Sequence, residues 1–521
     1  MQQTVGSYDQ TMQALVFAER GAYGDLSYMP VFRASALFYA FADKDATTRI
    51  AFLNYWREKN HNHDVGVLVT VRDHKGIKCA RTFSQLSEMT YDFDLRLLLG
   101  NDQAFQGSIE IEAFSSQDLK FQFPGLSVFY ETSRGVSYVH ASQRIYNDAE
   151  DRARGVALNP WQTGFRLDAA EHDPFIFIVN GPVPFPGGEV DFVAVREDGL
   201  ELARKLTLQP LPAYATLDIR TAGIEGVHQF LGDKLGMCKI DLPLDNVHLR
   251  LVAGNALKDK SWLSVTHSYF DATEHSDYFD TSGLDPSVYP AFVPFVLPEE
   301  LDVDLVLYPI YARSTIELRL QGYGTEGNLR FEINLGEWRT PEGGMRHLKI
   351  RKLVRDQGID DSPGLYVLQL RAKNHQLPAR ITYGLDFHAG DSLGTNISSS
   401  AYLAKTWGSG RRTWKWGPVV AQTGGRNLIM VTAFSKIREE FLERKATLTF
   451  YAQHGPVAQK TLDLRGNAAL TLVAEDLMAA GGYAPSDGDI LWYVLRSDHA
   501  TLDVNQVCIS ADGLVGGDHS F

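Results

Sequence analysis

Three histidines recur at a nearly constant interval and are the first candidates for chemistry. His140 and His267 stand about 127 residues apart, and His519 follows His267 at about twice that interval. An imidazole can hold a metal ion or a polar ligand, so one interpretation is a ligand-binding position repeated along the chain. The other is a buried ring that bonds the backbone of a neighbouring strand. The corresponding segment of a further repeat, residues 396–400, holds no histidine, and we expect the structural role.

A second candidate combines aromatic and basic side chains near residue 410. Trp407, Trp414 and Trp416 flank the pair Arg411 and Arg412. Flat rings beside hydrogen-bonding groups suit sugar rings, and carbohydrate binding follows from analogy with other β-sandwiches. The competing interpretation is that these rings pack a joint between two domains.

Clustered carboxylates follow His267 in the chain. Asp271, Glu274, His275 and Asp277 offer the oxygen ligands that Ca²⁺ prefers, or an acid–base pair. Their spacing matches no EF-hand loop. We expect a solvated acidic linker and no cofactor, with Ca²⁺ as the one ion that this segment could take.

His61 and His63 form a candidate two-histidine metal site, with His74 close by in sequence. A strand expected over residues 65–72 would separate His74 from the other two by roughly 26 Å. We therefore do not join the three, and we expect a solvated loop at His61 and His63.

Little else in the sequence is typical of an active site. It has no phosphate-binding glycine-rich loop before a helix and no Cys-x-x-Cys pair. Catalytic groups can also come from distant positions, so the absence of such motifs disfavours an enzyme without deciding the question.

Composition excludes several classes of partner. The formal net charge is −14, and no basic run is longer than a pair such as Arg411-Arg412. Most of the surface would repel a phosphate backbone or an anionic membrane, so we expect no nucleic-acid partner. No apolar stretch approaches the ~20 residues of a membrane span, so we expect no membrane insertion. Protein or glycan partners, and assembly into oligomers, remain open.

Targeting signals and cysteines bear on the compartment. No Lys or Arg precedes Arg20, and the apolar run Ala14–Ala18 is short, so no secretory signal is recognised. We expect a protein that stays in the cytoplasm or leaves by an unconventional route. The odd count of three cysteines, Cys79, Cys238 and Cys508, is typical of free thiols, and we expect no disulfide.

The elements that must position these residues follow a fourfold pattern. Strand-like apolar runs centre on Phe52, Phe177, Val306 and Met430, at intervals of about 125 residues. Alternating runs on both sides of a glycine-containing turn follow the first, second and fourth of these, and less clearly the third, which is typical of β-hairpins. Because a single core stops growing near ~250–300 residues, the length of 521 residues also indicates several domains.

Each window holds about seven short strands and few helical segments, as in a β-sandwich of immunoglobulin-like size. We therefore predict an all-β protein of four tandem β-sandwiches from an internal repeat. The expected parts are a short helical or irregular N-terminal segment over 1–29, and sandwiches over 30–150, 160–285, 290–404 and 413–521.

The functional hypothesis is a non-enzymatic structural or interaction protein, in which the repeats supply length or several contacts. A surface, matrix, appendage or virion component would fit this role. The alternative is a carbohydrate-binding or carbohydrate-active protein with its site at a joint between domains.

Overall fold

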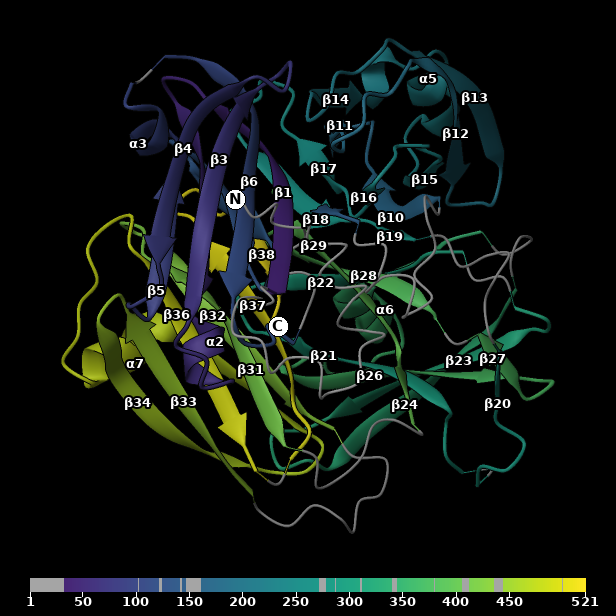
Figure 1. Ribbon diagram of the computed structural model, residues 1–521. Helices are drawn as coiled ribbons and strands as arrows, with labels where there is room; N and C mark the ends of the chain where they lie inside the picture. The colour runs from purple at the N-terminus through teal and green to yellow at the C-terminus, as the bar shows by residue number, and fades with distance from the viewer. Residues whose placement is uncertain are drawn as a thin grey trace, which may run out of the picture.

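Antiparallel β-sheet makes up most of the protein in the computed structural model (Figure 1). Strands hold 56% of the residues and helices 7%, so the all-β prediction is confirmed. None of the helices in the described part of the chain is long and apolar enough to cross a membrane. The structure describes residues 32–101, 103–120, 124–140, 143–146, 161–270, 278–285, 287–309, 312–339, 344–378, 380–404, 412–434, 444–498 and 500–521. The expected N-terminal segment therefore lies outside the described residues.

Eight strands form a first pair of four-stranded sheets. One sheet has the order β1-β6-β3-β4 and the other the order β5-β2-β7-β8. The strands are β1 (Phe32–Ala42), β2 (Ala46–Leu53), β3 (Val65–Asp73), β4 (Lys78–Gln85), β5 (Thr90–Asp94), β6 (Phe105–Ser115), β7 (Ser127–Thr132) and β8 (Gly135–Val139).

The same order recurs three times further along the chain: first-sixth-third-fourth strand in one sheet and fifth-second-seventh-eighth in the other. The second sheet pair comprises β10 (Gln162–Leu167), β11 (Asp173–Val179), β12 (Gly188–Arg196), β13 (Glu201–Leu208), β14 (Thr216–Arg220), β15 (Gly236–Ile240), β17 (Val252–Ala256) and β18 (Leu263–His267). The third comprises β21 (Ala291–Leu297), β22 (Asp302–Leu307), β23 (Ile316–Tyr323), β24 (Leu329–Trp338), β25 (Arg346–Lys349), β26 (Gly364–Ala372), β28 (Thr382–His388) and β29 (Thr395–Ser400). The fourth comprises β31 (Thr413–Val420), β32 (Arg426–Ala433), β33 (Arg444–Ala452), β34 (Gly455–Leu464), β35 (Ala468–Val473), β36 (Ile490–Ser497), β37 (Asp503–Ile509) and β38 (Val515–His519).

Short helices follow the fifth strand of every sheet pair, which the sequence pattern did not predict as a recurring feature. They are α3 (Leu95–Leu99), the turn η2 (Thr221–Gly223) with α5 (Val227–Leu231), α6 (Ile350–Asp356) and α7 (Ala474–Ala480). One further helix, α2 (Tyr55–Glu58), is described only in the first sheet pair.

Short extra strands connect neighbouring sheet pairs. β9 (Arg144–Ile145) pairs with β16 (Val247–His248), and β20 (Tyr278–Asp280) pairs with β27 (Gln376–Pro378). β19 (Tyr269–Phe270) and β30 (Tyr402–Leu403) each extend a four-stranded sheet to five strands. The chain segments between sheet pairs are therefore partly held in sheet structure.

The hairpin β3–β4 shows how the sequence produces this structure locally. Alternate valines of β3, among them Val67 and Val71, are fully buried, as the period of two in a strand requires. The turn is closed by the Asp73 carboxylate, which accepts from the amides of Lys75 and Ile77 at 3.0 and 2.8 Å. The equivalent hairpins β12–β13, β23–β24 and β33–β34 also form, so the hairpin prediction is confirmed at all four positions.

The four sheet pairs meet through their eighth strands. β8 packs against β18 and β38, and β29 packs against the same two strands, which closes a ring at the centre of the molecule (β18, β29 and β38 in Figure 1). Small residues allow this approach: an ideal Cβ on Gly516 would lie 2.2 Å from the Val136 carbonyl oxygen. The sheet pairs consequently form a cluster around the ring and not an extended rod.

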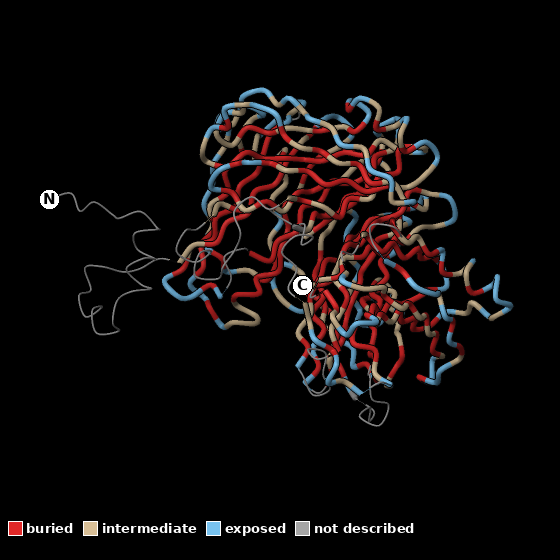
Figure 2. Tube along the Cα trace, turned by 90° about the vertical axis from the view of Figure 1, so that its right-hand side faces the viewer, coloured by how far each residue is buried: buried red, intermediate tan, exposed pale blue. Residues whose placement is uncertain are grey.

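Side chains on the ring strands bond across the sheet pairs. Ser137 Oγ accepts from the Val265 amide at 3.0 Å, and Thr395 Oγ1 donates to the Gly517 carbonyl at 3.1 Å. At the end where the strands begin, Trp262, Leu393 and Leu514 form a small apolar cluster. Buried segments run through the middle of the molecule and exposed ones lie at its rim, with the C-terminal end among the buried segments (Figure 2). One end of the ring is therefore closed by apolar side chains.

Candidate functional site

A pocket of about 340 Å³ lies at the other end of the ring, where the eighth strands finish. All four sheet pairs contribute to its wall. The lining residues are Tyr55, Lys59, Gly125, His140, Arg250, Tyr383, Ser399, Tyr402, Lys415, Trp416, Asp503, Asn505, His519, Ser520 and Phe521.

The three recurrent histidines meet beside this pocket. His140 follows β8 directly, while His267 and His519 are the last residues of β18 and β38. The ring centroid of His140 lies 4.9 Å from that of His267 and 4.4 Å from that of His519. The fourth ring strand, β29, contributes Ser399 to the pocket wall. Closing the ring of strands is what brings residues so distant in sequence together.

Hydrogen bonds fix the protonation of two of these rings. One Arg250 guanidinium nitrogen lies 3.1 Å from Nε2 of His140 and 3.2 Å from Nε2 of His267. Arginine can only donate, so both Nε2 atoms are unprotonated acceptors. The Nδ1 atoms therefore carry the hydrogen: His140 donates to Asp518 Oδ2 at 2.6 Å and His267 to the Ser268 carbonyl at 3.1 Å. Both rings are neutral.

Burial is the main cause of the shifted pKa values in this cluster. It lowers the pKa of His140 despite the neighbouring Asp518 carboxylate, and lowers that of His267 well below its usual range. It also lowers the pKa of His519 to about 3. For Asp518, burial acts in the opposite direction, but its interactions with His140, which include hydrogen bonds from the ring and from the backbone amide, hold its pKa below the usual value. The cluster thus holds an ionised carboxylate and neutral imidazoles.

His519 differs from the other two rings. Its Nδ1 donates to the Ser520 carbonyl at 3.1 Å. Its Nε2 is buried and has no hydrogen-bond partner within the described residues. A buried nitrogen without a partner loses its interaction with water and gains nothing in return, so this atom is available to a bound group.

A metal ion is one group that this cluster could hold. One ligand atom from each of His140, His267, Asp518 and His519 lies within 4.8 Å of the others, and imidazole with carboxylate suits zinc and other transition metals. However, the Arg250 guanidinium occupies the Nε2 lone pairs of two of the rings. A metal would have to displace it, so Arg250 is the cation of this cluster in the observed arrangement.

Two lysines, Lys59 and Lys415, also line the pocket. Lys59 Nζ lies 4.8 Å from the ring centroid of Trp416 and 4.9 Å from that of Trp414. Burial and then the charge of Lys415 lower the pKa of Lys59. Among the described residues, neither Lys59 nor Lys415 has a carboxylate within ion-pair distance. The pocket therefore concentrates positive charge in a protein whose net charge is −14.

Helix α2 places Lys59 at this wall. The Asn54 side chain accepts from the Arg57 amide and caps the helix, and Tyr55 and Trp56 are buried. The Lys59 amide bonds the Tyr55 carbonyl at 2.8 Å, so the two residues lie one turn apart on the same helix face. Both line the pocket.

Trp416 lies inside the joint between the first and fourth sheet pairs. Its ring stacks on Tyr55 at 5.3 Å and on Phe521 at 5.0 Å, and the residue is only 5% exposed. Trp414 is half-buried and packs edge-on against Trp416. Arg412 is exposed at the surface, near Asp498. The Trp416 ring therefore packs the joint between the first and fourth sheet pairs.

The remaining sequence candidates do not join this pocket. His61, His63 and His74 are exposed. All three cysteines are free, Cys79 exposed and the other two buried. Several further candidates lie outside the described residues: Trp407, Arg411, Asp271, Glu274, His275 and Asp277.

One Gly-x-Ser-x-Gly pentapeptide, residues 390–394, was not recognised from the sequence. In a hydrolase this motif forms a sharp turn between a strand and a helix. Here it connects the antiparallel strands β28 and β29, and Ser392 Oγ donates to the Gly513 carbonyl at 3.0 Å. The pentapeptide therefore serves as a turn and a contact with the fourth sheet pair.

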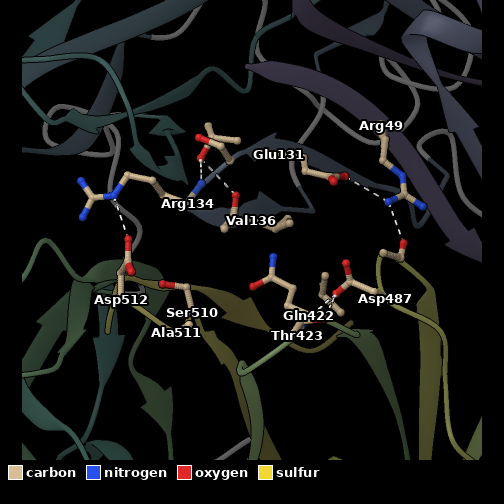
Figure 3. Close-up of a pocket in the computed structure, with 15 residues that line it drawn as sticks. Arg49, Glu131, Arg134, Val136, Gln422, Thr423, Asp487, Ser510, Ala511 and Asp512 are labelled. Atoms are coloured by element: carbon tan, nitrogen blue, oxygen red, sulfur yellow. Dashed lines mark hydrogen bonds and ion pairs between the residues drawn. The ribbon is translucent and has the colours of Figure 1, made fainter. Parts of the chain in front are cut away.

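A second pocket, of about 280 Å³, lies between the first and fourth sheet pairs (Figure 3). Ion pairs cross it or line it: Arg49 with Glu131 at 3.1 Å and Arg134 with Asp512 at 3.1 Å. Arg49 also donates to the Gly488 carbonyl at 2.8 Å. Its charged groups are already paired with each other, so this pocket is a polar contact between sheet pairs.

No family model matches the sequence, and no curated protein matches it significantly.

Sequence reasoning found the histidines and Trp416 but not Arg250, Lys59, Lys415 or Asp518. Asp518 adjoins a recurrent histidine, and this adjacency was the one signal that could have identified it. The other three come from non-equivalent places in their sheet pairs.

Proposed function

We propose that the chain is a tandem array of four β-sandwich units produced by internal duplication, and that it is a non-enzymatic binding protein with one central pocket. The recurrence of one strand order in four successive sheet pairs supports the duplication. Each unit begins near a boundary expected from the repeat of about 125 residues, and each contributes its eighth strand to the ring.

The observation that carries the binding role is the composition of the pocket wall, to which all four units contribute. Pockets of ~300–1,000 Å³ with apolar walls and a few convergent polar groups are typical of small-molecule sites. Two of the recurrent histidines, His140 and His519, line this pocket, and the third, His267, is fully buried beside them. Of the structural and interaction roles considered, the geometry thus favours ligand binding.

Binding is favoured over catalysis by the hydrogen bonds of two of the three imidazoles. All four ring nitrogens of His140 and His267 are engaged in hydrogen bonds. A general base needs a lone pair within reach of its substrate, and these two rings offer none. Their bonds instead hold Arg250 in place at the pocket wall.

The carbohydrate alternative gains no support from Trp416. A sugar would need an open aromatic face, whereas this ring is 5% exposed and stacked on Tyr55 and Phe521. We therefore propose a different ligand class below.

A pocket-filling substitution tests the proposal. Ser399 lines the pocket and is partly exposed, so Ser399→Trp should fill part of its volume. The matched control is Thr82→Trp on the exposed face of β4. Native mass spectrometry against a small-molecule library should find ligands that bind the wild type and Thr82→Trp but not Ser399→Trp. If every ligand found still binds Ser399→Trp, the central pocket is not the binding site.

A further inference from the structure

We infer that the ligand of the central pocket is a small organic anion, with a carboxylate or phosphate group and a flat apolar body. This inference rests on the proposed binding role of the pocket. It follows from three cations in the wall, Arg250, Lys59 and Lys415, and from the aromatic side chains beside them.

Arg250 is the best-placed anchor for the anionic group. Its guanidinium donates to two neutral imidazoles and to no carboxylate among the described residues. The Asp518 carboxylate is hydrogen-bonded to His140 instead, and its charge raises the pKa of Arg250 less than burial lowers it. Burial lowers the pKa of Arg250, because the guanidinium has lost water without gaining an ionic partner. An anion in the pocket would supply that partner.

Lys59 and Lys415 also favour an anion in the pocket. Burial and the charge of Lys415 lower the pKa of Lys59, and the Lys59 ammonium lies over the rings of Trp414 and Trp416. An anion between Lys59 and Lys415 would replace this repulsion by two attractions, in surroundings that screen charge less than water.

Asp503 in the wall and Asp518 beside it both accept hydrogen bonds from other protein groups. Asp503 accepts from the Tyr402 hydroxyl at 2.6 Å. Asp518 accepts from the His140 amide at 2.6 Å and from the His519 amide at 2.8 Å, in addition to the His140 ring. These bonds direct the carboxylate oxygens to the protein and leave the cations to face the pocket. A positive pocket in an acidic protein also focuses the field on anions.

The apolar part of the ligand is defined by the aromatic side chains. Phe521, Tyr383 and Tyr402 line the pocket together with the cations. Aromatic side chains pack best against flat rings, face to face or edge to face. An aromatic carboxylate or aryl phosphate fits this combination better than a bare inorganic anion.

Four test compounds with one ring system separate charge from shape: 2-naphthoate, 2-naphthyl phosphate, 2-naphthamide and 2-naphthylmethylammonium. Isothermal titration calorimetry with the full chain should show binding of the two anions. The amide should bind at least about tenfold more weakly, which corresponds to ~1.4 kcal/mol, and the ammonium compound should not bind. Raising the salt concentration should weaken binding of the anions.

Variants locate the anionic group. Lys59→Met and Lys415→Met should each weaken 2-naphthoate binding about tenfold, while Lys205→Met, which removes a surface lysine paired with Asp191, should leave it unchanged. Arg250→Met tests the anchor, and the lysine variants decide the question if Arg250→Met does not fold.

The outcomes separate the two proposals. If the amide or the ammonium compound binds as tightly as the anions, and Ser399→Trp abolishes that binding, the anion preference is refuted and the pocket remains the binding site. If binding of the anions is unaffected by Ser399→Trp, both proposals fail. Failure of all four compounds to bind the wild type would refute the ligand class inferred here.

Discussion

The contact between β8 and β38 should be the point at which a single methyl group weakens the ring. An ideal Cβ on Gly516 would lie 2.2 Å from the Val136 carbonyl oxygen and 2.8 Å from Ser137 Cα. Both distances are far below ordinary van der Waals contact, and both neighbours are backbone atoms of another sheet pair. Gly516→Ala must therefore separate the two strands, at a cost of about 1–3 kcal/mol as for other overpacked cores.

The control for this substitution is Gly223→Ala, because nothing lies within 4 Å of the Cβ it would add. Replacing glycine by alanine at an unstrained site stabilises a protein by ~0.4–1 kcal/mol through the unfolded chain, and this contribution is common to both variants. The stability difference between the two proteins thus isolates the clash at the ring.

A chain of several units need not unfold in one step, so the assay should combine denaturant unfolding with hydrogen exchange read by mass spectrometry. We expect faster exchange in peptides of β8 and β38 in Gly516→Ala, together with a lower unfolding midpoint. Equal midpoints and equal exchange in Gly516→Ala and Gly223→Ala would show that this contact does not hold the sheet pairs together.

Three further predictions concern the histidine cluster. His267→Ala removes a fully buried ring with bonds to Ser268 and Arg250, and should lower the free energy of unfolding by about 1–3 kcal/mol; an unchanged melting temperature with loss of a ligand or metal would contradict a structural role. Arg250→Ala frees the Nε2 atoms of two rings, so the variant should bind Co²⁺ or Zn²⁺, seen as Co²⁺ absorption bands that the wild type lacks; absence of metal uptake would show that the cluster is not a cation site. The pKa of His519 is lowered to about 3 from 6.5, so the unfolded chain binds more protons than the folded one. The contribution of this neutral ring to the free energy of unfolding is full above about pH 6.5 and is lost as the pH falls toward 3, by up to ~1.4 kcal/mol per pH unit. The denaturant midpoint should therefore decrease less between about pH 7 and about pH 5 in His519→Gln than in the wild type.

The local parts of the fold could be predicted from the sequence because they depend on neighbouring residues. Alternating valines on β3, followed by the turn at Gly76, produced the β3–β4 hairpin where it was expected. The third hairpin was expected less clearly, since β24 bulges against β23 near Leu318 and Gly322. A bulge shifts the alternation by one residue and weakens the period on which the prediction depends.

The site could be predicted only in part, for a different reason. The spacing of His140, His267 and His519 marked equivalent positions but did not place them together, because the ring of eighth strands is formed by contacts between units. Arg250 lies in the connection between β16 and β17, and Lys59 ends a helix described only in the first unit. No repeated pattern marks such residues, so the positive charge of the pocket emerged only from the structure.

Three of the four ring strands bring a histidine to the cluster, whereas the fourth, β29, has none and brings Ser399 to the pocket wall. On the proposed duplication, a fully symmetric cage would offer any guest four equivalent orientations. The lack of a histidine on β29 breaks that equivalence, so that a guest of irregular outline has a single preferred orientation. Each quadrant, meaning the part of the pocket wall that one unit contributes, is also encoded by a separate segment of the gene. A substitution in one segment alters that part of the wall while the other three keep their shape. Selectivity for new guests could therefore evolve one quadrant at a time.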